Sequence, residues 1–94
     1  MPKMRVRFAR SATRHRISKT DIEHVIAHYR VRFEQPPPVA GAAVRTMRIV
    51  YLGEDTQGRA LEVMAVDGIN DERLVIHAMP LRKKYRVRYD EAPR

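Results

Sequence analysis

The sequence predicts an α+β fold with the following order: an N-terminal strand, two helices, a three-stranded antiparallel meander and a C-terminal basic helix. Two observations carry this prediction. Apolar residues recur with helical spacing between residues 22 and 29, and from Val44 onward the apolar pattern is that of strands separated by turns. Because 94 residues is the length of one compact domain, residues 1–94 are expected to form a single unit.

The N-terminal elements differ in the strength of their patterns. Residues 4–8 alternate apolar and basic side chains, which is typical of a short edge strand. Residues 10–16 are polar and are expected to form a short helix. The second helix, from about residue 19 to 30, begins after a capping box of Ser18 and Asp21. Its apolar stripe consists of Ile22, Val25, Ile26 and Tyr29.

The rest of the chain is predicted as a loop, three strands and a helix. Prolines at positions 36–38 cannot continue a helix, so residues 34–43 are expected to form a loop. Three segments rich in Val, Ile, Leu, Met and Tyr follow: 45–53, 59–67 and 72–79. Residues 81–92 fit both a strand and a helix face, and Pro80 before them favours the helix.

The three strands have a register that gathers apolar side chains on one face. With loops at residues 54–58 and 68–71, nine aligned positions are all apolar. They are Met47, Ile49, Tyr51, Leu61, Val63, Ala65, Leu74, Ile76 and Ala78. Because a slip of one residue would turn every side chain to the other face, this agreement predicts the core face, with the helix stripe as its cover.

On the opposite face, the same register brings three polar side chains together. Glu62 lies directly opposite His77, and Arg48 is diagonal to Glu62. A metal-independent ribonuclease could use such groups to move protons and to stabilise the phosphorane. The same residues would also make a structural cross-strand pair balanced by an arginine. A two-residue turn at 67–68 would change the register and place Glu62 opposite Arg73.

The net charge of +8 is concentrated at the two ends of the chain. Residues 1–32 carry a net charge of +7 and residues 82–94 carry +4, whereas residues 33–81 carry −3. This distribution indicates a polyanionic partner, either nucleic acid or an acidic protein. The candidate RNA-binding residues are basic side chains and interleaved rings on which bases could stack: His15, Arg82, Lys83, Tyr85, Arg86 and Tyr89.

Composition argues against several other classes of protein. The chain has no cysteine, so a disulfide framework and a thiolate zinc site are excluded. No segment approaches the roughly 18 apolar residues of a membrane span, so a soluble, cytoplasmic protein is expected, with no membrane partner. His24 and His28 are spaced as metal ligands on a helix, but no second ligand cluster accompanies them. Neither a metal nor another cofactor is expected.

Most of the chain resembles the BrnT-type toxins of bacterial type II toxin–antitoxin modules, which belong with the RelE/ParE-like small ribonuclease folds. The first similar stretch, residues 8–18, contains a basic-His-x-hydrophobic-Ser pattern. The second joins residues 49–53 to residues 58–63, and the third runs from residues 74–78 into residues 82–91. The resemblance implies a RelE/ParE-like fold. It also implies a small toxin that cleaves RNA, inhibits translation and is neutralised by a cognate antitoxin protein.

The functional hypothesis is an endoribonuclease toxin that acts on free or ribosome-associated RNA. Glu62 and His77 would form its acid–base pair. Arg48 and Arg82 would contact phosphate, and Tyr89 would contact a base. The alternative is a non-catalytic nucleic-acid-binding module that uses the same basic N- and C-terminal segments, and a third interpretation is a protein-interaction domain that binds no nucleic acid.

Overall fold

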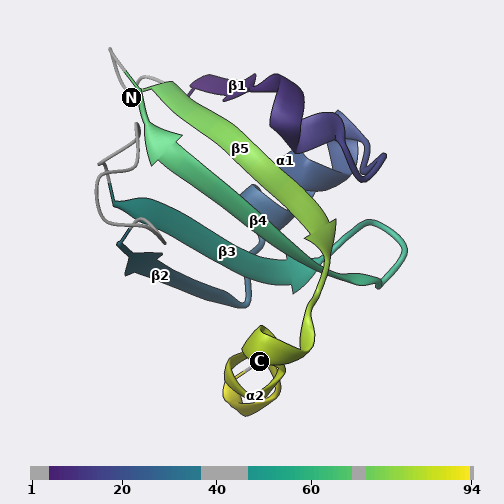
Figure 1. Cartoon of the computed structure of the whole chain (residues 1–94). Coiled ribbons are helices and arrows are strands. Elements are labelled where there is room, and N and C mark those ends of the chain that lie inside the picture. Colours follow the sequence, from purple (N-terminus) through teal and green to yellow (C-terminus); the bar gives the residue numbers. More distant parts are fainter. Residues whose placement is uncertain (1–4, 37–46, 69–71, 94) are drawn as a thin grey trace.

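The computed structural model describes residues 5–36, 47–68 and 72–93, which form a five-stranded mixed sheet with helices against it (Figure 1). The strands are β1 (Arg5–Phe8), β2 (Val31–Gln35), β3 (Arg48–Glu54), β4 (Ala60–Asp67) and β5 (Glu72–Pro80). The α-helices are α1 (Lys19–Ala27) and α2 (Arg86–Glu91), and the 3-10 helices are η1 (Arg10–Thr13) and η2 (Lys83–Tyr85). The strand order is β1-β5-β4-β3-β2, in which β1 runs parallel to β5 and all other neighbours are antiparallel.

The predicted fold is wrong in its sheet and in its N-terminal helices. The sheet has five strands and not three, because β1 pairs with β5 and residues 31–35 pair with β3. The segment predicted as a first helix contains only the four-residue 3-10 turn η1, in which Ala12 alone is buried. One small apolar contact is too little to hold a longer helix. The RelE/ParE-like order of elements that the resemblance implies, with two N-terminal helices and a three-stranded meander, is therefore also wrong.

The boundaries of α1 and β2 explain the added strand. α1 ends at Ala27, three residues earlier than predicted, and β2 begins at Val31. Within β2, partly buried Val31 and Phe33 alternate with exposed Arg32 and Glu34, which is the pattern of a half-buried strand. Tertiary pairing with β3 therefore decides this segment. Residues 37–46, which hold most of the predicted loop, lie outside the described residues.

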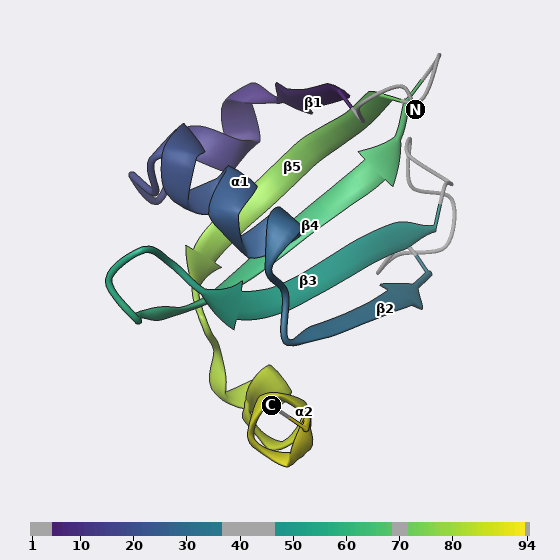
Figure 2. The same ribbon diagram turned by 180° about the vertical axis from the view of Figure 1, so that it is seen from behind.

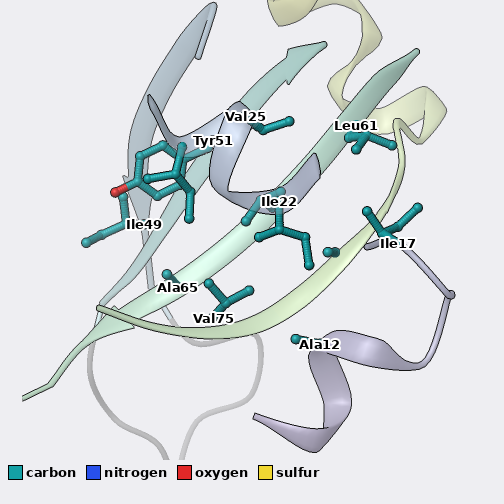
Figure 3. Close-up of a cluster of buried hydrophobic side chains, with 12 residues drawn as sticks. Ala12, Ile17, Ile22, Val25, Ile49, Tyr51, Leu61, Ala65 and Val75 are labelled. Atoms are coloured by element: carbon teal, nitrogen blue, oxygen red, sulfur yellow. The ribbon is translucent and has the colours of Figure 1, made fainter. Parts of the chain in front are cut away.

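One face of the sheet is covered by α1 (Figure 2). Ile22, Val25 and Ile26 on α1 are buried, as the helical stripe predicts, whereas Tyr29 is 47% exposed beyond the end of the helix. Figure 3 shows Ile22 and Val25 of the helix opposite side chains of the strands, with Ala12 and Ile17 beside them. The strand residues in this core are Ile49, Tyr51, Leu61, Val63, Ala65, Val75 and Ala78.

Ser18 caps the N-terminus of α1. The free energy of unfolding of the Ser18→Ala variant is therefore expected to be about 1 kcal/mol lower than that of the unmodified protein. The Ser18 hydroxyl oxygen accepts a hydrogen bond from the Asp21 backbone N–H at 3.1 Å, which pairs one of the free amides of the first turn. Urea unfolding measures the difference. Thr20→Ala, on an exposed position of the same turn, is the matched control, and an equal loss in both variants would contradict the capping role.

The turn between β3 and β4 ties the helix to the sheet. Asp55 is buried, and its Oδ1 accepts backbone N–H groups of Gln57 and Arg59 at 2.9 and 2.8 Å. The backbone of Gly58 has a φ of 83°, a left-handed conformation that glycine adopts without steric cost. Asp21 of α1 accepts hydrogen bonds from both the backbone N–H and the hydroxyl of Thr56. These contacts fix α1 across the end of β3 and β4.

The β4–β5 register differs from the predicted one, and β5 contains a bulge. Residues 64 and 65 of β4 pair with His77 and Val75, so Ile76 is an extra residue in β5. Val75 therefore joins the core under α1, whereas Leu74 and Ile76, predicted to be core residues, do not. The β3–β4 register also differs by two residues from the prediction. An even shift keeps the same side chains on each face, so the β3 and β4 core positions from Ile49 onward are correct.

The sheet face opposite α1, called the open face below, has a second and smaller apolar cluster. It contains Val50, Leu52 and Met64, and it is covered at one end by the buried rings of Tyr85 and Tyr89. In Figure 1 the chain leaves β5 and turns into η2 and α2 past the end of the strand. The C-terminal helix is thus present as a 3-10 turn and six α-helical residues, and it leaves the rest of the open face uncovered by helices of the described chain.

Candidate active site

A buried carboxylate is the centre of the polar cluster on the open face. Glu62 on β4 has no exposed surface, although it lies next to the apolar residues of that face. Its Oε1 accepts the Arg82 backbone N–H at 2.8 Å. Its Oε2 accepts hydrogen bonds from Nε and Nη2 of Arg82 at 2.9 and 2.6 Å, and it contacts Nε2 of His77 at 3.1 Å. Arg82 and His77 together therefore contact both carboxylate oxygens.

These contacts decide the ionisation of Glu62. Burial by itself would raise the pKa of this carboxyl, but the hydrogen bonds from His77 and Arg82, with the charge of Arg82, outweigh burial and lower the pKa to about 2. Glu62 is therefore a carboxylate at neutral pH. With no exposed surface and both oxygens engaged, it is placed to orient its neighbours and not to exchange a proton with a bound substrate.

The ionised Glu62 fixes the tautomer of neutral His77. A carboxylate only accepts hydrogen bonds, so the proton of the contact must lie on Nε2 of His77. The other ring nitrogen, Nδ1, then carries the lone pair. The His77 side chain is 24% exposed, and within the described residues no hydrogen bond engages Nδ1. His77 is thus a partly exposed imidazole whose Nε2 edge is held by a buried carboxylate.

The path of the chain after β5 explains why Arg82 reaches Glu62. Pro80 ends the strand, and the Leu81 N–H donates to the Ala60 carbonyl at 3.0 Å, which extends the pairing with β4 by one residue. Arg82 follows directly and folds back over Glu62. The Arg82 side chain remains 39% exposed, so its guanidinium also faces solvent. Arg82 was expected to bind phosphate, but its ion pair with Glu62 was not predicted, because this pair depends on the register of β4 and β5.

The expected contact between Glu62 and His77 is confirmed, but through a different register. Met79 and not His77 lies directly opposite Glu62, and His77 reaches it diagonally from its place opposite Met64. The bulge at Ile76 sets this diagonal. The alternative turn at 67–68 is not found, because Asp67 pairs with Arg73.

The prediction that Arg48 belongs to this cluster is wrong. It opens β3 and pairs with Gln35 of β2, whereas Glu62 pairs with Leu52 at the other end of β3. Four residues separate Arg48 from Leu52, which is about 13 Å at the usual rise of a strand. Arg82, supplied by the chain after β5, occupies the position beside the carboxylate that Arg48 was expected to hold.

The two candidate stacking tyrosines are structural. Tyr85 and Tyr89 are each 5% exposed. The Tyr85 hydroxyl donates to Gln35, and its ring packs against Phe33. The Tyr89 hydroxyl donates to Glu54 at 3.0 Å, and the Arg30 guanidinium lies 4.5 Å from the centre of its ring. Because both rings are occupied from within the protein, neither is available to stack on a base.

The remaining candidate RNA-binding residues are on the surface. Lys83 and Arg86 are exposed, and Arg86 forms a long ion pair with Asp90 at 3.6 Å. His15 is exposed on the turn after η1, and its ring centre lies 6.0 Å from that of His77 with the rings edge to face. The structure therefore places the His15 ring beside that of His77, although 62 residues separate the two in the chain.

His24 and His28 lie elsewhere, on and just after α1. Their rings are 4.7 Å apart, and they line a surface pocket of about 360 Å³ with Tyr29, Arg30, Glu54, Asp55 and Pro93. This pocket shares no residue with the Glu62 cluster. Among residues 5–36, 47–68 and 72–93, no three His, Asp or Glu side chains are grouped as a metal site.

Comparison of the chain with family models, curated proteins and solved structures found no match in any of the three. No helix in the described ranges is long and apolar enough to cross a membrane.

Proposed function

We propose that this chain is the toxin of a type II toxin–antitoxin module, similar to the BrnT type, and that it cleaves RNA without a metal ion. The observation that carries the proposal is the imidazole of His77, whose Nε2 contacts a buried, ionised Glu62 while the side chain remains partly exposed. A histidine held in this way by a carboxylate is a general base with a fixed tautomer, as in the hydrolases that pair these groups.

The chemistry would use the groups of this cluster in distinct roles. Nδ1 of His77 would remove the proton of an RNA 2′-hydroxyl, and the charge of Glu62 would stabilise the imidazolium that forms. The partly exposed guanidinium of Arg82 would face the phosphate and stabilise the negative charge of the phosphorane. This assignment differs from the sequence hypothesis, because Glu62 orients His77 instead of exchanging protons itself.

The charge distribution supports an anionic substrate and an anionic inhibitor. The net charges of the two ends, +7 and +4, would attract RNA in the cytoplasm and would also favour an acidic segment of a cognate antitoxin. Exposed Lys83 and Arg86 lie close in sequence to Arg82, so phosphates beside the scissile one would be bound there.

Incubation of the purified protein with single-stranded RNA in EDTA is the direct test. We expect cleavage to persist in the chelator and to give a 2′,3′-cyclic phosphate and a 5′-hydroxyl, because the 2′-oxygen is the nucleophile. Expression of the chain alone is expected to arrest bacterial growth, and the neighbouring antitoxin gene should relieve the arrest. Intact RNA at every protein concentration would contradict the proposal, as would cleavage that EDTA abolishes.

The alternative is a non-catalytic nucleic-acid-binding module. The complete pairing of Glu62 with Arg82 favours it, because such a pair would also serve a purely structural purpose. This function predicts RNA binding that weakens with salt and no cleavage. Replacing Lys83 and Arg86 with alanine should then lower the slope of log affinity against log salt by about 1.4 for single strands.

A further inference from the structure

His15 is brought to the candidate active site by a turn that is anchored to β5. The Ala9 N–H donates to the Val75 carbonyl at 2.8 Å, and the Ser11 hydroxyl donates to the Ile76 carbonyl at 2.6 Å. These two acceptors immediately precede His77. η1 therefore continues along β5 where the pairing with β1 stops, and this places the His15 ring 6.0 Å from the His77 ring.

The backbone after His15 is held in an unfavourable conformation. Arg16 has a φ of 59°, and it is the only non-glycine residue of the described chain with a positive φ. Outside glycine, this left-handed conformation is sterically costly, and it persists where the surrounding structure imposes it. Here Ala12 and Ile17 are both buried on either side of the exposed His15. The turn at Arg16 allows Ile17 to enter the core while His15 stays beside His77.

The proposed reaction needs a second group that His77 cannot supply. While His77 takes the 2′-hydroxyl proton, the departing 5′-oxygen must receive a proton from another residue. Glu62 is buried and ionised, and Arg82 does not release protons at neutral pH. An exposed imidazole beside His77 has the required chemistry, since histidine exchanges protons near neutral pH.

We propose that His15 is the general acid of the cleavage reaction, an inference that rests on the proposed function. The 2′-oxygen forms a bond to phosphorus as its proton passes to Nδ1 of His77. The bond between phosphorus and the 5′-oxygen breaks, and the protonated imidazole of His15 gives its proton to that oxygen. The products are a 2′,3′-cyclic phosphate and a 5′-hydroxyl, and no oxidant or co-reactant is consumed. The substrate must be RNA, because DNA lacks the 2′-hydroxyl.

A leaving group that needs no proton tests this assignment. In an RNA whose bridging 5′-oxygen is replaced by sulfur, the thiolate departs without a general acid. We expect the His15→Ala and His15→Gln variants to cleave ordinary RNA about 10²–10⁴-fold more slowly than the unmodified protein. On the sulfur-bridged RNA, their cleavage rates should lie within about tenfold of that of the unmodified protein. His77→Ala should remain impaired on both substrates, because the base is still required. His24→Ala, which removes a histidine outside this cluster, is the matched control and should cleave both normally.

The outcomes separate this inference from the proposed function. If the unmodified protein cleaves RNA and His15→Ala cleaves it equally well, His15 is not the acid, and the proposed function stands. If both His15 variants lose cleavage but the sulfur-bridged RNA does not restore it, the inference is also wrong. Absence of cleavage by the unmodified protein overturns both proposals. Urea unfolding of the variants establishes that each is folded before its cleavage is compared.

A pair of substitutions at Arg16 tests the role of the turn. Arg16→Gly keeps the left-handed backbone available and removes the side chain, whereas Arg16→Val disfavours this backbone because valine is β-branched. We expect Arg16→Val to cleave ordinary RNA at least tenfold more slowly than Arg16→Gly, and the difference to shrink on the sulfur-bridged substrate. Equal rates on ordinary RNA would contradict the positioning of His15 by this turn.

Discussion

RNA cleavage by the His77→Gln variant is expected to be about 10²–10⁴-fold slower than cleavage by the unmodified protein, which is the contribution of a general base. Glutamine is the informative replacement, because its amide N–H can take the place of Nε2–H and preserve the hydrogen bond to Glu62. It has no basic nitrogen, however, and it cannot accept the 2′-hydroxyl proton. The rate of appearance of the cyclic phosphate measures the effect.

The stability of this variant separates chemistry from folding. We expect the free energy of unfolding of His77→Gln to stay within about 1 kcal/mol of that of the unmodified protein, since the buried carboxylate keeps its partners. The matched control is His28→Ala, which removes a histidine of the separate pocket and should leave RNA cleavage unchanged. Retention of full cleavage by His77→Gln would contradict the assignment of His77 as the base.

Loss of the Glu62 charge is expected to be the most damaging single change to stability around the site. Glu62→Gln leaves the Arg82 guanidinium without its counter-charge next to the apolar cluster of the open face. Removing one partner of a fully buried pair costs about 3–5 kcal/mol. Because the Arg82 side chain is 39% exposed and can be partly hydrated, we expect a loss of about 2–3 kcal/mol in urea unfolding.

A double variant separates the cost of an unpaired charge from a general loss of packing. Replacing both Glu62 and Arg82 with methionine removes the two charges together, and apolar replacements of a buried pair are often neutral or stabilising. We expect this variant to recover most of the stability lost in Glu62→Gln, and to remain inactive on RNA. If the double variant is less stable than Glu62→Gln, the penalty does not come from the unpaired arginine.

The same carboxylate predicts how stability depends on acid. The pKa of Glu62 is about 2 in the folded protein, below its ordinary value of 4.5. A group with a lowered pKa stabilises the fold above about pH 4.5, and this stabilisation is lost as the pH falls from 4.5 towards 2. The shift corresponds to about 3 kcal/mol.

Comparison with Glu62→Gln isolates that contribution. The pKa values of Asp21 and Asp55 are also lowered, the first by hydrogen bonds from Thr56 and Ser18, the second because hydrogen bonds outweigh burial. Both therefore add to the loss of stability in acid. The difference between the unmodified protein and Glu62→Gln should shrink as the pH falls from 5 to 2. A difference that stays constant over this range would contradict the lowered pKa of Glu62.

The sequence was sufficient for features that depend on local patterns. The capping residue Ser18 and the buried stripe of Ile22, Val25 and Ile26 follow from spacing along one helix. The three strands of the meander lie within a few residues of their predicted bounds, because runs of apolar residues and turn residues delimit them. The contact between Glu62 and His77 was also predicted, since the side chains of neighbouring strands meet on one face even when the exact register differs.

Only the tertiary structure decided the features that depend on partners distant in sequence. Residues 31–35 and 5–8 belong to one sheet because β3 and β5 offer them hydrogen bonds, and no local pattern reports such pairing. The bulge at Ile76 belongs to the β4–β5 register, in which Arg82 folds over Glu62. The β3–β4 register separates Arg48 from the cluster, because it places Glu62 opposite Leu52. The ring of His15 reaches His77 through contacts that close a loop of more than sixty residues. The sequence therefore determined which polar residues are candidates for a site, whereas long-range pairing determined which of them meet, because contact across a sheet depends on register and not on spacing along the chain.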